Sequence, residues 1–287
     1  MNKFSCYLCR GNEYIRRDGC VRDKPELEIW QCTTCGLVCL STFEHISEAV
    51  YKASAMHANQ PVSEYVSNRQ ELDDLARRFR DFSPYIIGKR LLDFGCGNGK
   101  FLSLCKPLAS EVYGIELDKR WYPQFNKFDI IVAPTLDKLH HESDFDVVTM
   151  LHVLEHLPDP LTILKKIHSR IHKSSLLIIE VPNADDALLT LYKCKSFSAF
   201  TYWSFHLFYY TSQTLRQLLE KAGFKNVTTM QVQRYSLTNH LYWLTEGKPG
   251  GHIHWDFLND SILTESYNAR LSNLGICDTI IGFFQKI

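Results

Sequence analysis

The stretch RLLDFGCGNGKFL, residues 90–102, constrains the fold of this 287-residue chain more than any other. An apolar run comes first, three glycines follow at alternate positions, and the next residues are typical of a helix start. Gly95, Gly97 and Gly99 permit a tight turn and let a ligand approach backbone amides without interference from a Cβ atom. Glu116 closes the next apolar run about twenty residues later, at the spacing of a carboxylate that binds ribose hydroxyls.

Short apolar runs alternate with helical patterns from residue 90 onward. The runs are RLLDFG, EVYGIEL, FDIIVA, FDVVTML and SLLIIEV, and helices are predicted around 99–107, 118–126, 159–172 and 212–222. Alternation of this kind predicts βαβ units and a doubly wound, Rossmann-like α/β sheet. An amphipathic helix over 63–82, capped by Ser63, is predicted to precede the sheet.

The end of the chain carries an insertion between two strand candidates. KNVTTMQVQ follows a helix that ends at Gly223, and DTIIGFFQKI closes the chain. About forty residues lie between them, which is too long for a bare hairpin loop. We therefore predict an inserted cap at about 234–276, within a domain over 61–287.

Four paired cysteines near the N-terminus predict a metal site. Cys6 and Cys9 form one CxxC pair, and Cys32 and Cys35 form another, with the strand candidate LEIWQC before the second. Two such turns bring four thiolates within tetrahedral reach of one Zn²⁺, as in the knuckles of a zinc ribbon. A site with four thiolates leaves no open position for water, so we expect the zinc to be structural. Residues 1–60 are predicted to form this ribbon-like module and a linker.

Composition limits the partners of the chain. Lys plus Arg and Asp plus Glu are both 32, so no basic surplus points to nucleic acid, and a small-molecule acceptor is favoured. The N-terminus has no apolar signal region, and no run of about 18 apolar residues occurs. We expect a cytoplasmic protein without a membrane span, with its ten cysteines reduced.

The glycine turn alone leaves a nicotinamide enzyme and a methyltransferase open, and further motifs separate them. LDFGCGNGKFL resembles the first motif of class I S-adenosylmethionine-dependent methyltransferases, and FDVVTMLHVLEHLPDP resembles the motif at their fourth strand. EVPN at 180–183 and LLEKAGF at 218–224 follow in the usual order of that family. The resemblance covers residues 90 to about 230 and implies a sheet that ends with an antiparallel strand, here over 277–287.

The resemblance assigns residues at the strand ends to the cofactor S-adenosylmethionine. Glu116 is implied to accept hydrogen bonds from the ribose hydroxyls, and Leu117 to lie beside the adenine. Thr135 is an adenine candidate, since the acidic residue usual there is absent or displaced to Asp137. Asp93 is implied to act at the turn, through water or the methionine amino group. The implied cofactor-binding set is Asp93, Gly95, Gly97, Gly99, Glu116, Leu117 and Thr135.

Two histidines are catalytic candidates. His152, just past the fourth strand, faces the methyl end of the cofactor in many members of the family, or else packs within the core. Glu155 and His156 are expected to hold the start of the next helix. His206 is the one histidine of the aromatic segment AFTYWSFHLFYYTS, and it either takes a proton from the acceptor or closes an aromatic core.

A second resemblance concerns the acceptor. A zinc-binding module before a methyltransferase domain, with a histidine and aromatic segment later, looks like the sugar C-methyltransferases of deoxysugar pathways. Their HEHxxYFS-like stretch is here Ser204-Phe205-His206, so the Glu-His pair that serves deprotonation of a keto-sugar is incomplete, and the chain is shorter. We therefore expect O-methylation of a sugar nucleotide or a surface-polysaccharide precursor. C-methylation of a keto-deoxysugar nucleotide and RNA methylation guided by the zinc ribbon remain alternatives.

Overall fold

The computed structural model describes residues 5–47, 69–139 and 144–287, and its main body is a seven-stranded sheet. The strand order is β10-β11-β8-β7-β4-β5-β6, and β11 runs antiparallel to both of its neighbours while β8, β7, β4, β5 and β6 run parallel. The strands are β4 (Arg90–Phe94), β5 (Glu111–Ile115), β6 (Ile131–Ala133), β7 (Phe145–Leu151), β8 (Ile171–Pro182), β10 (Phe224–Val232) and β11 (Thr279–Lys286). This arrangement confirms the predicted Rossmann-like fold and its antiparallel last strand.

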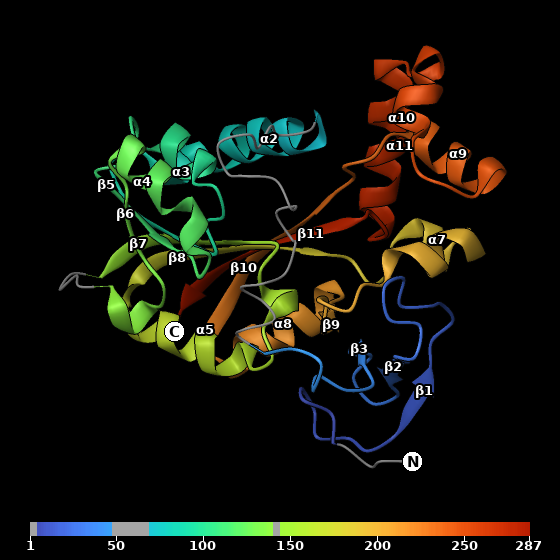
Figure 1. Ribbon diagram of the computed structural model, residues 1–287, viewed down its shortest axis with the longest axis horizontal. Helices are drawn as coiled ribbons and strands as arrows, with labels where there is room; N and C mark the ends of the chain where they lie inside the picture. Colours follow the sequence, from blue (N-terminus) through green and yellow to red (C-terminus); the bar gives the residue numbers. More distant parts are fainter. Residues whose placement is uncertain (1–4, 48–68, 140–143) are drawn as a thin grey trace.

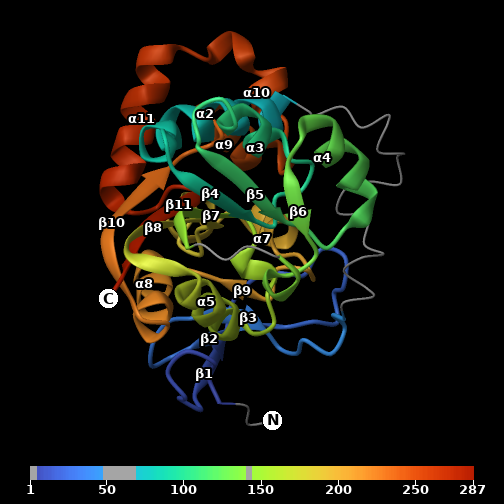
Figure 2. The same cartoon turned by 90° about the vertical axis from the view of Figure 1, so that its left-hand side faces the viewer.

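Helices cover both faces of the main sheet. Figure 2 shows α2 (Arg69–Ile86) and α3 (Lys100–Cys105) on one face, with α5 (Pro160–Ser169) and α8 (Ser212–Lys221) on the other. α4 (Tyr122–Phe128) packs beside β6 at the edge. The predicted helix over 63–82 therefore continues to Ile86, and its proposed Ser63 cap lies outside the described residues. In the part of the chain that the structure describes, no helix has the length and apolar character needed to cross a membrane.

The stretch between β10 and β11 is helical. It contains α9 (Leu237–Glu246), α10 (Gly251–His254), the 3₁₀ turn η6 (Asp256–Leu258) and α11 (Ser261–Leu274). Figure 1 shows these helices standing beyond one end of the main sheet. Sequence patterns missed α9, and also missed α6 (Ala187–Thr190) and α7 (Lys195–Thr201), which lie between β8 and α8.

A second, smaller sheet joins the N-terminal residues to the main body. Its order is β1-β2-β3-β9, where β1 (Tyr14–Arg16), β2 (Ile29–Cys32) and β3 (Val38–Leu40) belong to the cysteine-bearing module. The fourth strand, β9 (Phe208–Tyr209), comes from the segment before α8 and pairs antiparallel with β3. The predicted boundary near residue 60 falls outside the described residues.

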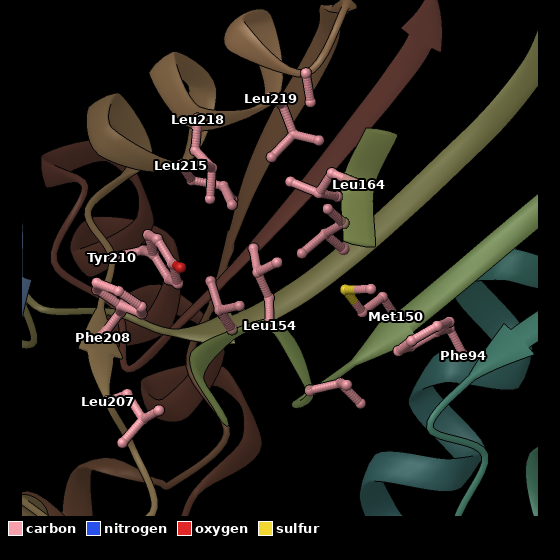
Figure 3. Close-up of a cluster of buried hydrophobic side chains, with 14 of the residues drawn as sticks. Phe94, Met150, Leu154, Leu164, Leu207, Phe208, Tyr210, Leu215, Leu218 and Leu219 are labelled. Carbon is pink, nitrogen blue, oxygen red and sulfur yellow. The ribbon is translucent and has the colours of Figure 1, made fainter. Parts of the chain in front are cut away.

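One apolar core spans both sheets. Figure 3 shows Phe208 and Tyr210 close to Leu154, with α8 leucines on one side and Met150 farther along the main sheet. The same cluster of buried side chains includes Leu8, Ile29 and Leu37 of the N-terminal module. The module is therefore packed into the main body rather than tethered beside it.

Phe208 offers a direct test of this shared core. Its ring is 1% exposed and lies 5.2 Å from the ring centroid of Tyr7 and 5.0 Å from that of Phe43. Phe208→Ala is expected to lower the free energy of unfolding by about 3–5 kcal/mol, because it opens a cavity at the junction. Denaturant unfolding measures this change, and Phe257→Ala, at an 80% exposed position, serves as the matched control. An effect no larger than that of the control would contradict the shared core.

Candidate active site

A cavity of about 680 Å³ lies along the carboxyl ends of β4, β5 and β7. Clefts of this size at the ends of parallel strands are where open α/β sheets bind their ligands. Of the seven implied cofactor-binding residues, Gly99 alone is not among the described lining residues. The other six are Asp93, Gly95, Gly97, Glu116, Leu117 and Thr135.

The glycine turn presents its backbone to this cavity. Gly97 has φ +52°, and a Cβ atom built on it would meet nothing within 4 Å, so open space lies where a ligand would approach. Gly95 has φ +78°, and a Cβ atom there would lie 2.5 Å from Val153 Cγ2. Gly97 therefore leaves room for a ligand, whereas the absence of a side chain at Gly95 allows close packing against the chain after β7.

Two carboxylates flank the turn. Asp93 is buried and accepts a hydrogen bond from Thr149 Oγ1 at 2.6 Å, and burial raises its pKa to about 6. Glu116 accepts from the backbone N–H of Gly97 at 2.8 Å and from that of Asp118 at 2.8 Å, and burial raises its pKa above the ordinary value. The Glu116 carboxylate is therefore oriented at the edge of the cavity, where the resemblance implies ribose hydroxyls.

The part of the cavity implied to hold the adenine is more exposed to solvent than the part around the glycine turn. Leu117 is half-buried and Thr135 is exposed, and both line the cavity. Asp137, the displaced acidic candidate, pairs with Lys166 at 2.6 Å, and both side chains also line the cavity. Adenine recognition at this end would therefore rest on apolar contact and backbone groups more than on a buried carboxylate.

His152 lies on the cavity wall between two carboxylates. Its φ of +56° is unusual for a non-glycine residue, and its backbone N–H donates to Glu180 O at 2.8 Å. The ring Nδ1 lies 3.2 Å from Glu155 Oε1, and Nε2 lies 3.1 Å from Glu180 Oε1, out of line for a good hydrogen bond. Burial lowers the pKa of His152, but the two carboxylates raise it by more, so the protonated form of the ring is favoured. In that form the ring does not accept a proton from an acceptor.

Glu180 connects His152 to helix α2. Its fully buried carboxylate accepts from Arg77 Nη2 at 2.9 Å and from Arg78 Nη2 at 2.7 Å. Burial raises its pKa, but Arg78, His152 and Arg77 hold it well below the ordinary value. A buried carboxylate requires such partners, because an unpaired charge in the interior is costly.

A second ion pair closes the same end of the cavity. Asp74 on α2 accepts from Arg234 Nε at 3.0 Å, and Arg234 follows β10. Asp74, Arg78, Arg234 and Glu71 all line the cavity. The sequence did not predict Glu71, Asp74 and Arg78 at this site, because charges on an amphipathic helix resemble a solvent-exposed face.

His156, which is buried, and His206, which is half-buried, form a pair next to this wall. Their ring centroids lie 4.8 Å apart, and His156 lines the cavity, whereas His206 is not among the described lining residues. His156 Nδ1 donates to Phe205 O at 2.8 Å, so Nε2 is its basic nitrogen. Burial lowers the pKa of His206 to about 3 and also lowers that of His156, so both rings are neutral at neutral pH. From the sequence, His156 was expected only to hold the start of the next helix, so its place on the cavity wall was not predicted.

Glu155 is the third member of a group with metal-binding capacity. One ligand atom from each of Glu155, His156 and His206 lies within 4.8 Å of the others. Glu155 Oε2 and His206 Nδ1 are buried without a hydrogen-bond partner among the described residues.

The four predicted zinc ligands do converge. Cys6 Sγ lies 3.6 Å from Cys35 Sγ, and Cys9 Sγ lies 3.5 Å from Cys32 Sγ, without disulfides. Bonds of about 2.3 Å to a tetrahedral Zn²⁺ imply sulfur separations of roughly 3.8 Å, so the spacing fits the ion. The backbone N–H of Gly11 donates to Cys9 Sγ at 3.3 Å, as expected around a metal-bound sulfur. These residues could hold zinc, and none of them lines the described cavity.

The chain matches a protein family over much of its length. Residues 65–229, more than half of the chain, match the model of a methyltransferase domain, and the chain belongs to this family. Its fold is that of class I S-adenosylmethionine-dependent methyltransferases, and the cavity fits that cofactor at the glycine turn.

Curated relatives match part of the chain. A ubiquinone biosynthesis O-methyltransferase of Thiobacillus denitrificans is 30% identical over 103 residues, which are 33% of this chain and 44% of that protein. One from Pseudomonas aeruginosa is 25% identical over 153 residues, covering 50% of this chain and 66% of that protein. The chain thus spans about half the length of the curated relatives it matches.

Solved structures share the fold. An S-adenosylmethionine-dependent methyltransferase from Archaeoglobus fulgidus has a TM-score of 0.51 and 24% identity, covering 76% of this chain and 95% of that chain. The 1,6-didemethyltoxoflavin-N1-methyltransferase of Burkholderia thailandensis, solved with S-adenosylhomocysteine, has a TM-score of 0.52 and 14% identity, covering 88% and 97%. At these identities the likeness concerns the fold alone.

Zinc binding is tested at Cys35. Elemental analysis of the purified chain is expected to find about one zinc per molecule, and Cys35→Ser is expected to lose it and to unfold more easily. Cys20→Ser is the matched control, because Cys20 lies in the same module outside the four-cysteine group. A zinc content that is absent in the unchanged chain, or equal in Cys35→Ser, would overturn the assignment.

Cofactor binding is tested at Glu116. Glu116→Gln is expected to raise the dissociation constant for S-adenosylmethionine about 10–100-fold, because it weakens charge-assisted hydrogen bonds. Isothermal titration calorimetry measures this change. Glu111→Gln, at the exposed start of the same strand, should bind as the unchanged chain does. Equal affinities of the two variants would remove Glu116 from the cofactor site.

Proposed function

We propose that the chain transfers a methyl group from S-adenosylmethionine to a hydroxyl oxygen of a sugar-containing acceptor, such as a sugar nucleotide or a surface-glycan precursor. The observation that supports the acceptor class is the composition of the cavity wall near α2, away from the glycine turn, where charged side chains form ion pairs. Asp74 pairs with Arg234, and Arg78 pairs with Glu180. Paired charges offer many hydrogen-bond donors and acceptors without a strong net field, which suits the uncharged sugar part of such an acceptor.

The proposed reaction is a displacement aligned by the cavity. The cofactor, when bound, supplies a methyl group on a positively charged sulfur. The acceptor oxygen attacks the methyl carbon, the carbon–sulfur bond breaks, and the hydroxyl proton must leave. His156 is the neutral imidazole on the cavity wall, and we assign it the proton at Nε2. His206, the residue expected to be the base, is then a neutral neighbour of His156, and the two carboxylates beside His152 favour its positively charged form.

Transfer to oxygen is favoured over transfer to carbon. The curated relatives are named O-methyltransferases, although they match over a limited part of the chain. Ser204, which stands where the sugar C-methyltransferases have a histidine, is buried, and its Oγ donates to Asp23 Oδ2 at 2.6 Å. This contact turns Ser204 toward the N-terminal module, which supports the interpretation that deprotonation of a keto-sugar is not its task.

The RNA alternative is less well supported. Arg16 pairs with Glu28 at 3.3 Å, and Arg17 donates to Ala184 O. Arg22 lies over the ring of Phe200 at 5.2 Å. Because these three arginines have partners within the protein, they are less available to nucleic acid, which favours the small-molecule acceptor over RNA.

The assignment of the base is tested by substitution. With radiolabelled S-adenosylmethionine and a panel of sugar nucleotides, His156→Ala is expected to lower turnover about 10²–10⁴-fold while cofactor affinity stays unchanged. His206→Ala should lower turnover less, and His254→Ala, at an exposed position in the cap, should leave it unchanged. Full turnover in His156→Ala would remove that residue from the mechanism, and a larger loss in His206→Ala would restore the base first expected.

A further inference from the structure

The segment from Tyr202 to Tyr209 is held on one side by side chains and backbone of the N-terminal module. Asp23 accepts from the backbone N–H of Ser204 at 3.0 Å and from its Oγ at 2.6 Å. His45 Nε2 donates to Ser204 O at 2.7 Å. Ser204 is thus bound by its N–H, its carbonyl and its hydroxyl, and both partner residues, Asp23 and His45, come before position 48.

Backbone hydrogen bonds between the N-terminal module and the segment 202–209 add to these contacts. Leu40 N–H donates to Leu207 O at 3.1 Å, and β3 then pairs with β9 in the register of Val38 with Tyr209. A strand of two residues does not persist alone, because isolated pairs of strands are marginal in water. The position of β9 is therefore imposed by the sheet of the module.

The same segment holds the cavity wall on its other side. Leu207 N–H donates to Glu155 O at 2.8 Å, and Phe205 O accepts from His156 Nδ1 at 2.8 Å. Glu155 and His156 belong to η5 (Leu154–His156), the 3₁₀ turn that follows His152. Residues 202–209 therefore form a bridge with the module on one side and the histidine-bearing turn on the other.

His152 needs such support. A non-glycine residue with φ of +56° adopts a conformation that L side chains disfavour, and it persists where the surroundings determine it. The bond from its N–H to Glu180 O holds one side, and η5 holds the other. The position of η5 in turn depends on the bridge.

We infer that the N-terminal module positions the methyl-transfer end of the cavity, acting through Asp23 and Ser204 on His156 and His152. The importance of the module for turnover rests on the proposed function, but the positioning of His156 and His152 by the module does not. Asp23 is a positioning residue in this account, because it acts through the bridge and does not line the described cavity.

A clamp that served stability alone would behave differently. Its loss would raise hydrogen exchange throughout the fold by a similar factor, because every amide would exchange through global unfolding. A positioning contact, when lost, loosens the bridge and η5 while the strands β4 and β5 keep their protection.

Asp23→Ala separates the two cases in the full-length, zinc-loaded chain. Amide exchange followed by mass spectrometry is expected to become roughly tenfold faster over 203–209 and 152–157, and to stay unchanged over 90–94 and 111–115. The imidazole NMR signals of His156 and His206 are expected to shift. Asp23→Asn, which keeps an acceptor for Ser204, should restore most of the protection, and Glu26→Ala, at an exposed position of the same module, should match the unchanged chain.

Other outcomes would overturn the inference. Faster exchange confined to residues 20–26, or an equal increase over all segments, would mean that the module does not position the turn. These measurements need no acceptor and no turnover, so they remain informative if the proposed methyl acceptor is wrong. Calorimetry with S-adenosylmethionine on the same variant should give unchanged affinity, which separates a displaced wall from a damaged cofactor site.

Discussion

The burial of the Glu180 carboxylate at the end of β8 is the constraint on which the rest of the site depends. The interior tolerates such a charge only when partners surround it, and here they are Arg77 and Arg78 of α2 together with the ring of His152. These contacts dock α2 over the carboxyl ends of the strands, and the pair of Asp74 with Arg234 ties the same helix to the chain after β10. One buried charge thus organises the wall where the acceptor would lie.

The cofactor half of this site could be predicted from the sequence, because its determinants are local. The glycine turn and Glu116 lie on consecutive units of one repeating pattern, and their spacing follows from strand, turn and helix lengths. The acceptor half could not be predicted in the same way. Glu180 meets residues about one hundred positions earlier, and β9 finds its partner in β3, so neither contact leaves a local pattern. His156 was given a structural part because its motif also marks a helix start.

The two sheets carry different parts of the site. The larger one carries the glycine turn after β4 and Glu116 after β5, which the resemblance assigns to the cofactor, whereas the smaller one ends in β9, next to His206. Their common core, with Phe208 between Tyr7 and Leu154, makes the arrangement of the two sheets a property of packing as well as of hydrogen bonds. None of the four cysteines lines the described cavity, so a zinc ion there would act on the cavity through structure and not through chemistry.

The central claim is that this cavity holds the adenosine cofactor at the glycine turn, with its methyl end toward His152 and His156. Backbone amide NMR during titration with S-adenosylhomocysteine tests it most directly, because each shifted signal maps to a residue. The account predicts saturable shifts at Gly95, Gly97, Leu117 and Thr135, and smaller shifts at His152 and His156. Shifts confined to the cap helices or to the cysteine module, or no shifts at millimolar ligand, would contradict it.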